Sequence, residues 1–110
     1  MCTQNDAIRI MRETKRMCGE FFPAKEAYLY GSYARGDFHP ESDIDILITA
    51  DISPEDISKY RGQIAMITSE LSLENDVTVS VTVKPAEQFR RFSEAMPFYK
   101  NVKAEGIRYA

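Results

Sequence analysis

The sequence predicts a small α/β (α+β) domain, in which a small mixed β-sheet is covered by helices that pack mainly on one face. Apolar residues recur at helical spacing in two long segments, 6–22 and 53–71. Three short segments rich in aliphatic and aromatic residues, 26–30, 43–49 and 76–83, indicate strands. Helical and extended segments alternate along the chain, which is typical of a sheet layered with helices.

Length and composition limit the kind of protein this can be. The chain has 110 residues, which suits one domain over 1–110, with a core at about 24–84 and a helical tail at about 85–110. Its hydrophobic fraction of 44% and charged fraction of 28% are typical of a globular protein. The net charge of -3 argues against broad, non-specific nucleic-acid binding. With two cysteines, no signal peptide and no run of membrane-spanning length, we expect a cytoplasmic protein that does not span a membrane.

Three helices follow from the apolar pattern. The first is expected over 6–22 and ends before Pro23. The second begins at Ser53, because Ser53-Pro54 followed by two acidic residues is a strong helix start. Its apolar stripe at steps of three and four comprises Ile57, Tyr60, Ile64, Ile67 and Leu71. A further helix is expected from Pro85 to about Ala95.

The first strand, 26–30, leads directly into a glycine turn. Gly31 and Ser32 follow it, and a short helical turn through Arg35 ends at Gly36. A polar loop over 37–41 then leads into the second strand, 43–49. The third strand, 76–83, alternates four valines on one face with Asp76, Thr78, Ser80 and Thr82 on the other.

Strand alternation gives the acidic residues a common direction. Asp43 and Asp45 are two residues apart, so both point to one face while Ile44 and its alternating neighbours point to the core. If the second and third strands share a sheet, Asp76 joins them on the polar face. Three clustered carboxylates repel one another unless a cation neutralises them, and Mg²⁺ prefers such oxygen ligands. An Asp-x-Asp alone is more often a solvated strand edge, so the metal site depends on the combination with other features.

The Gly31-Ser32 turn is the second feature. Glycine allows the backbone to approach a ligand closely, and the start of the following helical turn directs N–H groups at an anion. A phosphate cradle beside an acidic cluster indicates a site for a nucleoside triphosphate and its metal ions.

The stretch GSYARGDFHPESDIDILI, preceded by an aromatic and aliphatic strand, closely resembles the signature of the minimal nucleotidyltransferases. These belong to the DNA polymerase beta-like nucleotidyltransferase superfamily. The resemblance is dense over residues 28–49 and extends loosely to about residue 83. It implies the nucleotidyltransferase fold and transfer of a nucleoside monophosphate, most often AMP from ATP.

The resemblance also implies roles for individual residues. Gly31 and Ser32 would hold the β- and γ-phosphates, and Asp43 and Asp45 would ligate two Mg²⁺ ions. The third carboxylate of the family lies on a neighbouring strand, where Asp76 is the candidate. Glu74 is the rival for that role.

Two other residues of the matched stretch have weaker assignments. Arg35 could contact phosphates or could hold the loop through an ion pair with Asp37 or Glu41. For His39, the only histidine, a place on a surface loop is favoured over a catalytic role.

The implied biological role is that of an antitoxin. Small members of the superfamily commonly accompany a HEPN-family toxin and silence it by transferring AMP to a tyrosine. Two alternatives stay open: a transferase for a small molecule or RNA with a separate acceptor subunit, and a non-catalytic module that sequesters its partner. The tail over 98–110 could cover the core, complete the nucleotide pocket or bind the partner, and the first is favoured. Acceptor, nucleotide preference and formation of an oligomer are left open.

Overall fold

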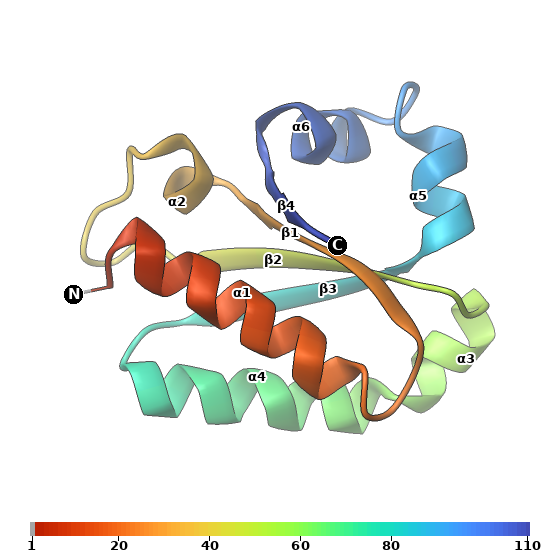
Figure 1. The fold of residues 1–110 in the computed structure, drawn as a ribbon, viewed down its shortest axis with the longest axis horizontal. Helices are drawn as coiled ribbons and strands as arrows, with labels where there is room; N and C mark the ends of the chain where they lie inside the picture. Colours follow the sequence, from red (N-terminus) through yellow and green to blue (C-terminus); the bar gives the residue numbers. More distant parts are fainter. Residues whose placement is uncertain (1) are drawn as a thin grey trace.

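A computed structural model describes residues 2–110 and contains one four-stranded mixed sheet. The strand order is β3-β2-β1-β4, where β1 is Ala24–Tyr30, β2 is Ile44–Ala50, β3 is Val79–Pro85 and β4 is Ile107–Tyr109 (Figure 1). β2 and β3 run parallel, whereas β1 runs antiparallel to both β2 and β4. The predicted α/β class with a small mixed sheet is confirmed.

The two longest helices, α1 (Gln4–Cys18) and α4 (Arg61–Asn75), cover one face of this sheet (Figure 1). Ile44, Ile46 and Ile48 of β2 point into that layer and are fully buried. They join one continuous apolar core with residues of α1, α4 and β1. The predicted alternation of β2 therefore buries its isoleucines as expected.

Helix α1 begins and ends earlier than the sequence pattern predicted. Thr3 caps it, because its side chain accepts a hydrogen bond from the Asp6 N–H while the Asp6 carboxylate accepts one from the Thr3 N–H. At the other end, the N–H groups of Phe21 and Phe22 both donate to the Cys18 carbonyl, which closes a turn before Pro23. The expected boundary at Phe22 was therefore wrong by one turn.

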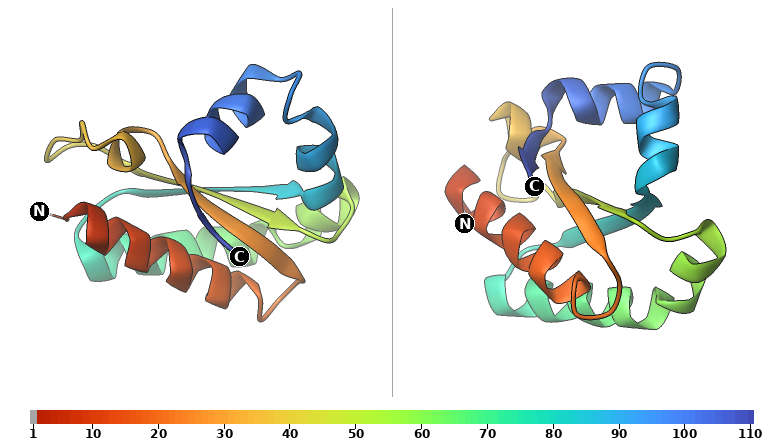
Figure 2. Two further views of the ribbon diagram at one scale, coloured as in Figure 1. Left: turned by 45° about the horizontal axis from the view of Figure 1, so that its top comes forward. Right: turned by 45° about the vertical axis from the view of Figure 1, so that its right-hand side comes forward.

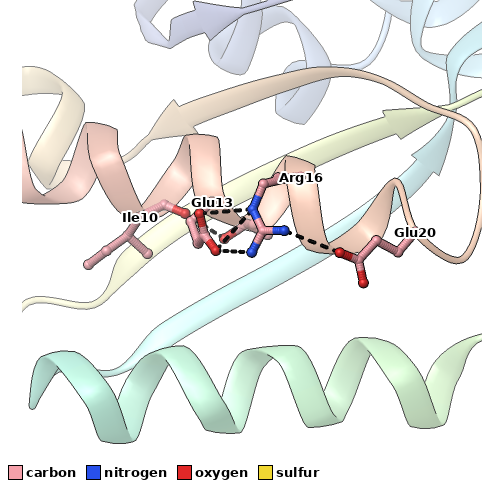
Figure 3. Close-up of polar contacts among 5 residues, drawn as sticks. Ile10, Glu13, Arg16 and Glu20 are labelled. Carbon is pink, nitrogen blue, oxygen red and sulfur yellow. Dashed lines mark hydrogen bonds and ion pairs between the residues drawn. The ribbon is translucent and has the colours of Figure 1, made fainter.

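Figure 3 shows ion pairs between side chains on the solvent-exposed side of α1. Arg16 forms ion pairs with Glu13, one turn before it, and with Glu20, one turn after it. Such exposed pairs contribute little individually. On the buried side, the Thr14 hydroxyl donates to the Ile10 carbonyl over 2.7 Å, which satisfies a polar group inside the core.

The segment after β2 forms two helices instead of the single one predicted. Ser53 caps α3 (Pro54–Lys59) through the Asp56 N–H, and α4 begins only at Arg61. Tyr60 lies between them with φ -100° and ψ 11°, outside the helical range. Its ring packs on Phe22 at 5.3 Å between centroids, so tertiary packing interrupts the periodic pattern at this residue.

Two shorter helices, α5 (Ala86–Phe92) and α6 (Pro97–Glu105), lie over the other face of the sheet (Figure 2). A second buried cluster forms there from Tyr28, Leu47, Phe89, Tyr99 and Val102. β4 follows α6 and pairs with residues 27–29 of β1. The tail therefore covers the core, as favoured from the sequence. No helix of the described residues is both long and apolar enough to cross a membrane.

Candidate active site

Asp43 and Asp45 lie at the start of β2, on the face opposite the large core. Asp43 precedes the strand and is exposed, whereas Asp45 is half-buried within it. The sheet register places Asp45 between Tyr30 of β1 and Ser80 of β3. Directly opposite residues in a sheet share a face, so Tyr30, Asp45 and Ser80 form one row.

Gly31 makes a close approach to Asp45 that no other residue would allow. It follows β1 with φ 75° and ψ -155°, a conformation available almost only to glycine. A Cβ atom at this position would lie 2.5 Å from Oδ2 of Asp45. The backbone of the turn is therefore in van der Waals contact with the carboxylate, which joins the two halves of the predicted site.

Ser32 begins helix α2 (Ser32–Arg35), as the sequence predicted. The Gly31 carbonyl accepts hydrogen bonds from the N–H groups of Ala34 and Arg35, both at 3.1 Å. Gly36 ends the helix in the left-handed region at φ 88°. From α1, the Gln4 side chain donates to the carbonyl of Tyr33 over 2.9 Å and fixes the turn to the body of the domain.

The local electrostatics favour binding of a cation. Burial, followed by the charge of Asp43, raises the pKa of the Asp45 carboxyl, and Arg35 opposes this only in part. The two carboxylates therefore carry negative charge that the surrounding residues do not neutralise. Since Mg²⁺ in phosphate-transfer sites is commonly held by one or two carboxylates together with substrate phosphates, Asp43 and Asp45 fit that ion.

Asp76 does not lie where the sequence predicted. It ends α4 in the left-handed conformation, with φ 50° and ψ 48°, and β3 begins three residues later at Val79. The prediction failed because DVTVSVTV alternates throughout, although its first residues form the helix cap and the connection. Within residues 2–110, no three Asp, Glu, His or Cys side chains are arranged to hold a metal ion. The expected trio of carboxylates is therefore not assembled.

Arg35 and His39 have structural partners in the loop between α2 and β2. The Arg35 guanidinium donates to Asp37 over 3.2 Å and lies 3.6 Å from Glu105 of α6, so it links the glycine turn to the C-terminal helix. The contact with Asp37 matches one of the two ion pairs considered from the sequence. The Ser42 hydroxyl accepts from the His39 N–H, and Nδ1 of His39 accepts from the Glu41 N–H. His39 is exposed and closes the loop.

Two aromatic side chains border the acidic face. The Tyr30 ring meets Phe98 of α6 edge to face, at 5.4 Å between centroids. Phe98 is 39% exposed, so an apolar surface remains open beside the carboxylates. No signal in the sequence indicated Phe98, because its position depends on how α6 folds back over the sheet.

Comparison with known proteins identifies the class of protein that this fold and site define. The model of the nucleotidyltransferase domain family matches residues 11–108, so the chain belongs to that family. It is a nucleotidyltransferase. The matched region includes the glycine turn, both aspartates, the strands β1, β2 and β3, and the first two residues of β4.

Two relatives from Methanocaldococcus jannaschii carry more specific names. "Putative protein adenylyltransferase MJ0604" is 35% identical over 82 residues, which are 74% of this chain and 74% of that protein. "Putative protein adenylyltransferase MJ0141" is 36% identical over 77 residues, 68% of this chain and 76% of that protein.

Solved structures agree with the fold. A structure described as a "putative minimal nucleotidyltransferase" superposes with a TM-score of 0.62 at 19% identity, covering 96% of this chain and 95% of that one. A toxin-antitoxin structure with AMP-PNP gives 0.58 at 22% identity, covering 97% and 72%. A variant of the MntA-HpeT toxin-antitoxin gives 0.55 at 18%, with the same coverages. The resemblance to the minimal nucleotidyltransferases is confirmed.

Proposed function

We propose that this protein is a Mg²⁺-dependent adenylyltransferase that transfers AMP from ATP to a hydroxyl group of a protein, acting as antitoxin on a HEPN-family toxin. The contact between the Gly31 backbone and the Asp45 carboxylate carries the proposal. It brings a turn suited to phosphates against a carboxylate suited to a metal. A nucleoside triphosphate with its cation needs both within a few ångströms.

In this proposal Asp43 and Asp45 hold Mg²⁺, and Gly31 with Ser32 receives the β- and γ-phosphates. When bound, the metal neutralises charge on the phosphate oxygens. The exposed Arg35 lies on the turn that follows and is placed to meet the triphosphate once it releases Asp37 or Glu105. Asp76, at the end of α4, is no longer proposed as a ligand.

The reaction forms one bond and breaks one. The acceptor hydroxyl oxygen bonds to the α-phosphorus, the bond from that phosphorus to the bridging β-oxygen breaks, and pyrophosphate leaves. The hydroxyl proton passes to solvent or to a nearby carboxylate.

A protein acceptor is supported by the names of the curated relatives, all four of which are called protein adenylyltransferases. A toxin as that protein is supported by the toxin-antitoxin structures that share the fold. ATP as donor is supported by the AMP-PNP bound in one of them.

The test is an incubation of the purified protein with Mg²⁺, ATP labelled on the α-phosphate and a HEPN-family protein encoded beside it. We expect label on the HEPN-family protein, lost in Asp43→Asn. Asp51→Asn is the matched control, because Asp51 is an exposed aspartate just beyond the other end of β2. The control should keep full activity.

Other outcomes distinguish the alternatives. Label on RNA or on a small metabolite, with none on the protein, would favour a different acceptor for the same chemistry. A tight complex without any label would favour sequestration and overturn the catalytic proposal.

A further inference from the structure

The position beside Asp45 on the neighbouring strand is filled by a serine. β2 and β3 are parallel and their register pairs Asp45 with Ser80. Ser80 is exposed and shares the face of Asp45, since Val79 on the other face is buried. A carboxylate on β3 that joined Asp45 in one metal site would have to occupy this position.

The neighbouring positions of β1 and β3 on this face of the sheet also lack an acid. On the other side of Asp45 the register places Tyr30, and the positions on the same face of β3 after Ser80 are Thr82 and Lys84. Before Ser80, Thr78 lies beside the start of β2, where its carbonyl accepts from the Ile44 N–H over 2.9 Å. The positions of β1 and β3 beside Asp45 therefore carry hydroxyl groups, and the lysine lies further along β3, opposite Thr49.

Resting on the proposed function, we propose that Ser80 stands in the place of a third metal-binding carboxylate. The pair Asp43 and Asp45 then binds a divalent cation firmly only when it arrives with the nucleoside triphosphate. Affinity for a hard cation rises with the number of charged oxygen ligands. Two carboxylates leave most of the coordination sphere of Mg²⁺ to water or phosphate oxygens.

The consequence is that the cation and the nucleoside triphosphate bind together, and not the cation first. The ligand that the free protein recognises is the complex of the cation with the triphosphate, held by the aspartates through the metal and by the Gly31 turn through the phosphates. The bare cation binds weakly, because the two carboxylates alone must replace part of its hydration shell.

The test measures binding of Mn²⁺, as a spectroscopic substitute for Mg²⁺, by electron paramagnetic resonance and calorimetry. We expect weak binding to the unmodified protein alone and binding at least about tenfold tighter when the ATP analogue AMP-PNP is present without an acceptor. In Ser80→Asp, binding of Mn²⁺ without nucleotide should tighten by about tenfold.

Two variants serve as controls. Ser69→Asp adds the same charge on an exposed position of α4, remote from β2, and should leave Mn²⁺ binding unchanged. Asp76→Asn should also leave it unchanged, because Asp76 caps α4 and lies outside the row.

Tight binding of Mn²⁺ to the unmodified protein without nucleotide would overturn the inference, as would its loss in Asp76→Asn. Equal affinities of Ser80→Asp and Ser69→Asp would overturn it too. Failure of the proposed function looks different: AMP-PNP with Mn²⁺ would then not bind to any of these variants.

Discussion

The two faces of the sheet differ sharply along a single strand. On one face of β2, Ile44, Ile46 and Ile48 are fully buried under α1 and α4. On the other, Asp43 is exposed and Asp45 is half-buried, whereas Leu47 and Thr49 further along are fully buried. The even-numbered isoleucines of this segment therefore supply the large core, and Asp43 and Asp45 at its start supply the candidate site.

This division indicates that different residues of the same strand segment govern the stability of the domain and its proposed activity. Burial of apolar surface supplies most of the stabilising free energy of a fold, and here it is concentrated on the isoleucine face. Substitutions of Asp43 and Asp45 should change activity without unfolding the protein, and substitutions of the buried isoleucines should do the reverse.

Asp43→Asn should produce the largest effect. Loss of one metal-binding carboxylate removes several kcal/mol of transition-state stabilisation, so we expect activity to fall by about 10³-fold. Because Asp43 is exposed, the free energy of unfolding should change little. The rate of label transfer checks the loss of activity, and a denaturation curve on the same sample checks that the free energy of unfolding changes little. Activity within threefold of the unmodified protein would remove Asp43 from the site.

Ile46→Ala should have the next largest effect, on stability. Truncation of a fully buried isoleucine leaves a cavity, and we expect the free energy of unfolding to fall by about 2–5 kcal/mol. Leu73→Ala is the control, because Leu73 is an 84% exposed residue of α4. Urea denaturation measures both. If Ile46→Ala cost no more than the control, the isoleucine face would not be the main source of stability.

Gly31→Ala should lower both the stability of the protein and its affinity for nucleotide. The new Cβ would collide with Oδ2 of Asp45 in a backbone conformation that alanine disfavours. We expect a loss of stability of about 1–3 kcal/mol together with weaker binding of Mg²⁺ and AMP-PNP. Gly62→Ala is the control, since a Cβ atom at Gly62 would meet nothing within 4 Å. Normal nucleotide binding by Gly31→Ala would show that the turn does not receive the phosphates.

Asp45→Asn should raise stability slightly at neutral pH while it lowers activity. Burial raises the pKa of Asp45 in the folded protein, so the folded state holds this proton more tightly than the unfolded state does. Stability is therefore lost as pH rises from the ordinary value of 3.8 through the raised pKa. Asparagine removes that loss.

Thermal melts at several pH values measure this effect. The variant should melt at a higher temperature than the unmodified protein at pH 7, and the difference should vanish below pH 3.8. A variant that melts lower at pH 7 would mean that the ionised carboxylate makes a stabilising contact.

Glu105→Gln should have the smallest effect. Its ion pair with Arg35 is exposed on both sides and spans 3.6 Å, so we expect no measurable change in melting temperature. Arg35 would be freed for phosphates, and binding of AMP-PNP with Mg²⁺ should strengthen by about twofold or less. Calorimetric titration checks the affinity, and weaker binding would show that Glu105 positions Arg35 for the nucleotide.

Local patterns predicted much of the fold. The alternation of Ile44 and its neighbours, the Gly31 turn and the cap at Ser53 each depend on a few adjacent residues, and the structure has all three. The break at Tyr60 and the position of Asp76 could not be predicted this way. The first depends on packing against Phe22, and the second on where a helix ends within a stretch that alternates like a strand.

The arrangement of the candidate site was predictable to a similar degree. Asp43, Asp45 and Gly31 lie within one local motif, and the structure brings Gly31 against Asp45, while their roles stay a prediction. The position of Ser80 beside Asp45 could be recognised only from the register of β2 and β3. These parallel strands are joined through two helices, so their pairing is not encoded in adjacent residues.

The pairing of β4 with β1 also has a consequence for synthesis. Residues 107–109 pair with residues 27–29, so residues 30–106 separate the two paired segments along the chain. On the ribosome, β1, β2 and β3 can assemble while α6 and β4 are still being made, since domains begin to form as the chain emerges. Until then Phe98 and Glu105 are not in place beside the nascent site. The newly made protein should therefore form its three-stranded core first and complete the surroundings of the candidate site only after α6 and β4 have been made.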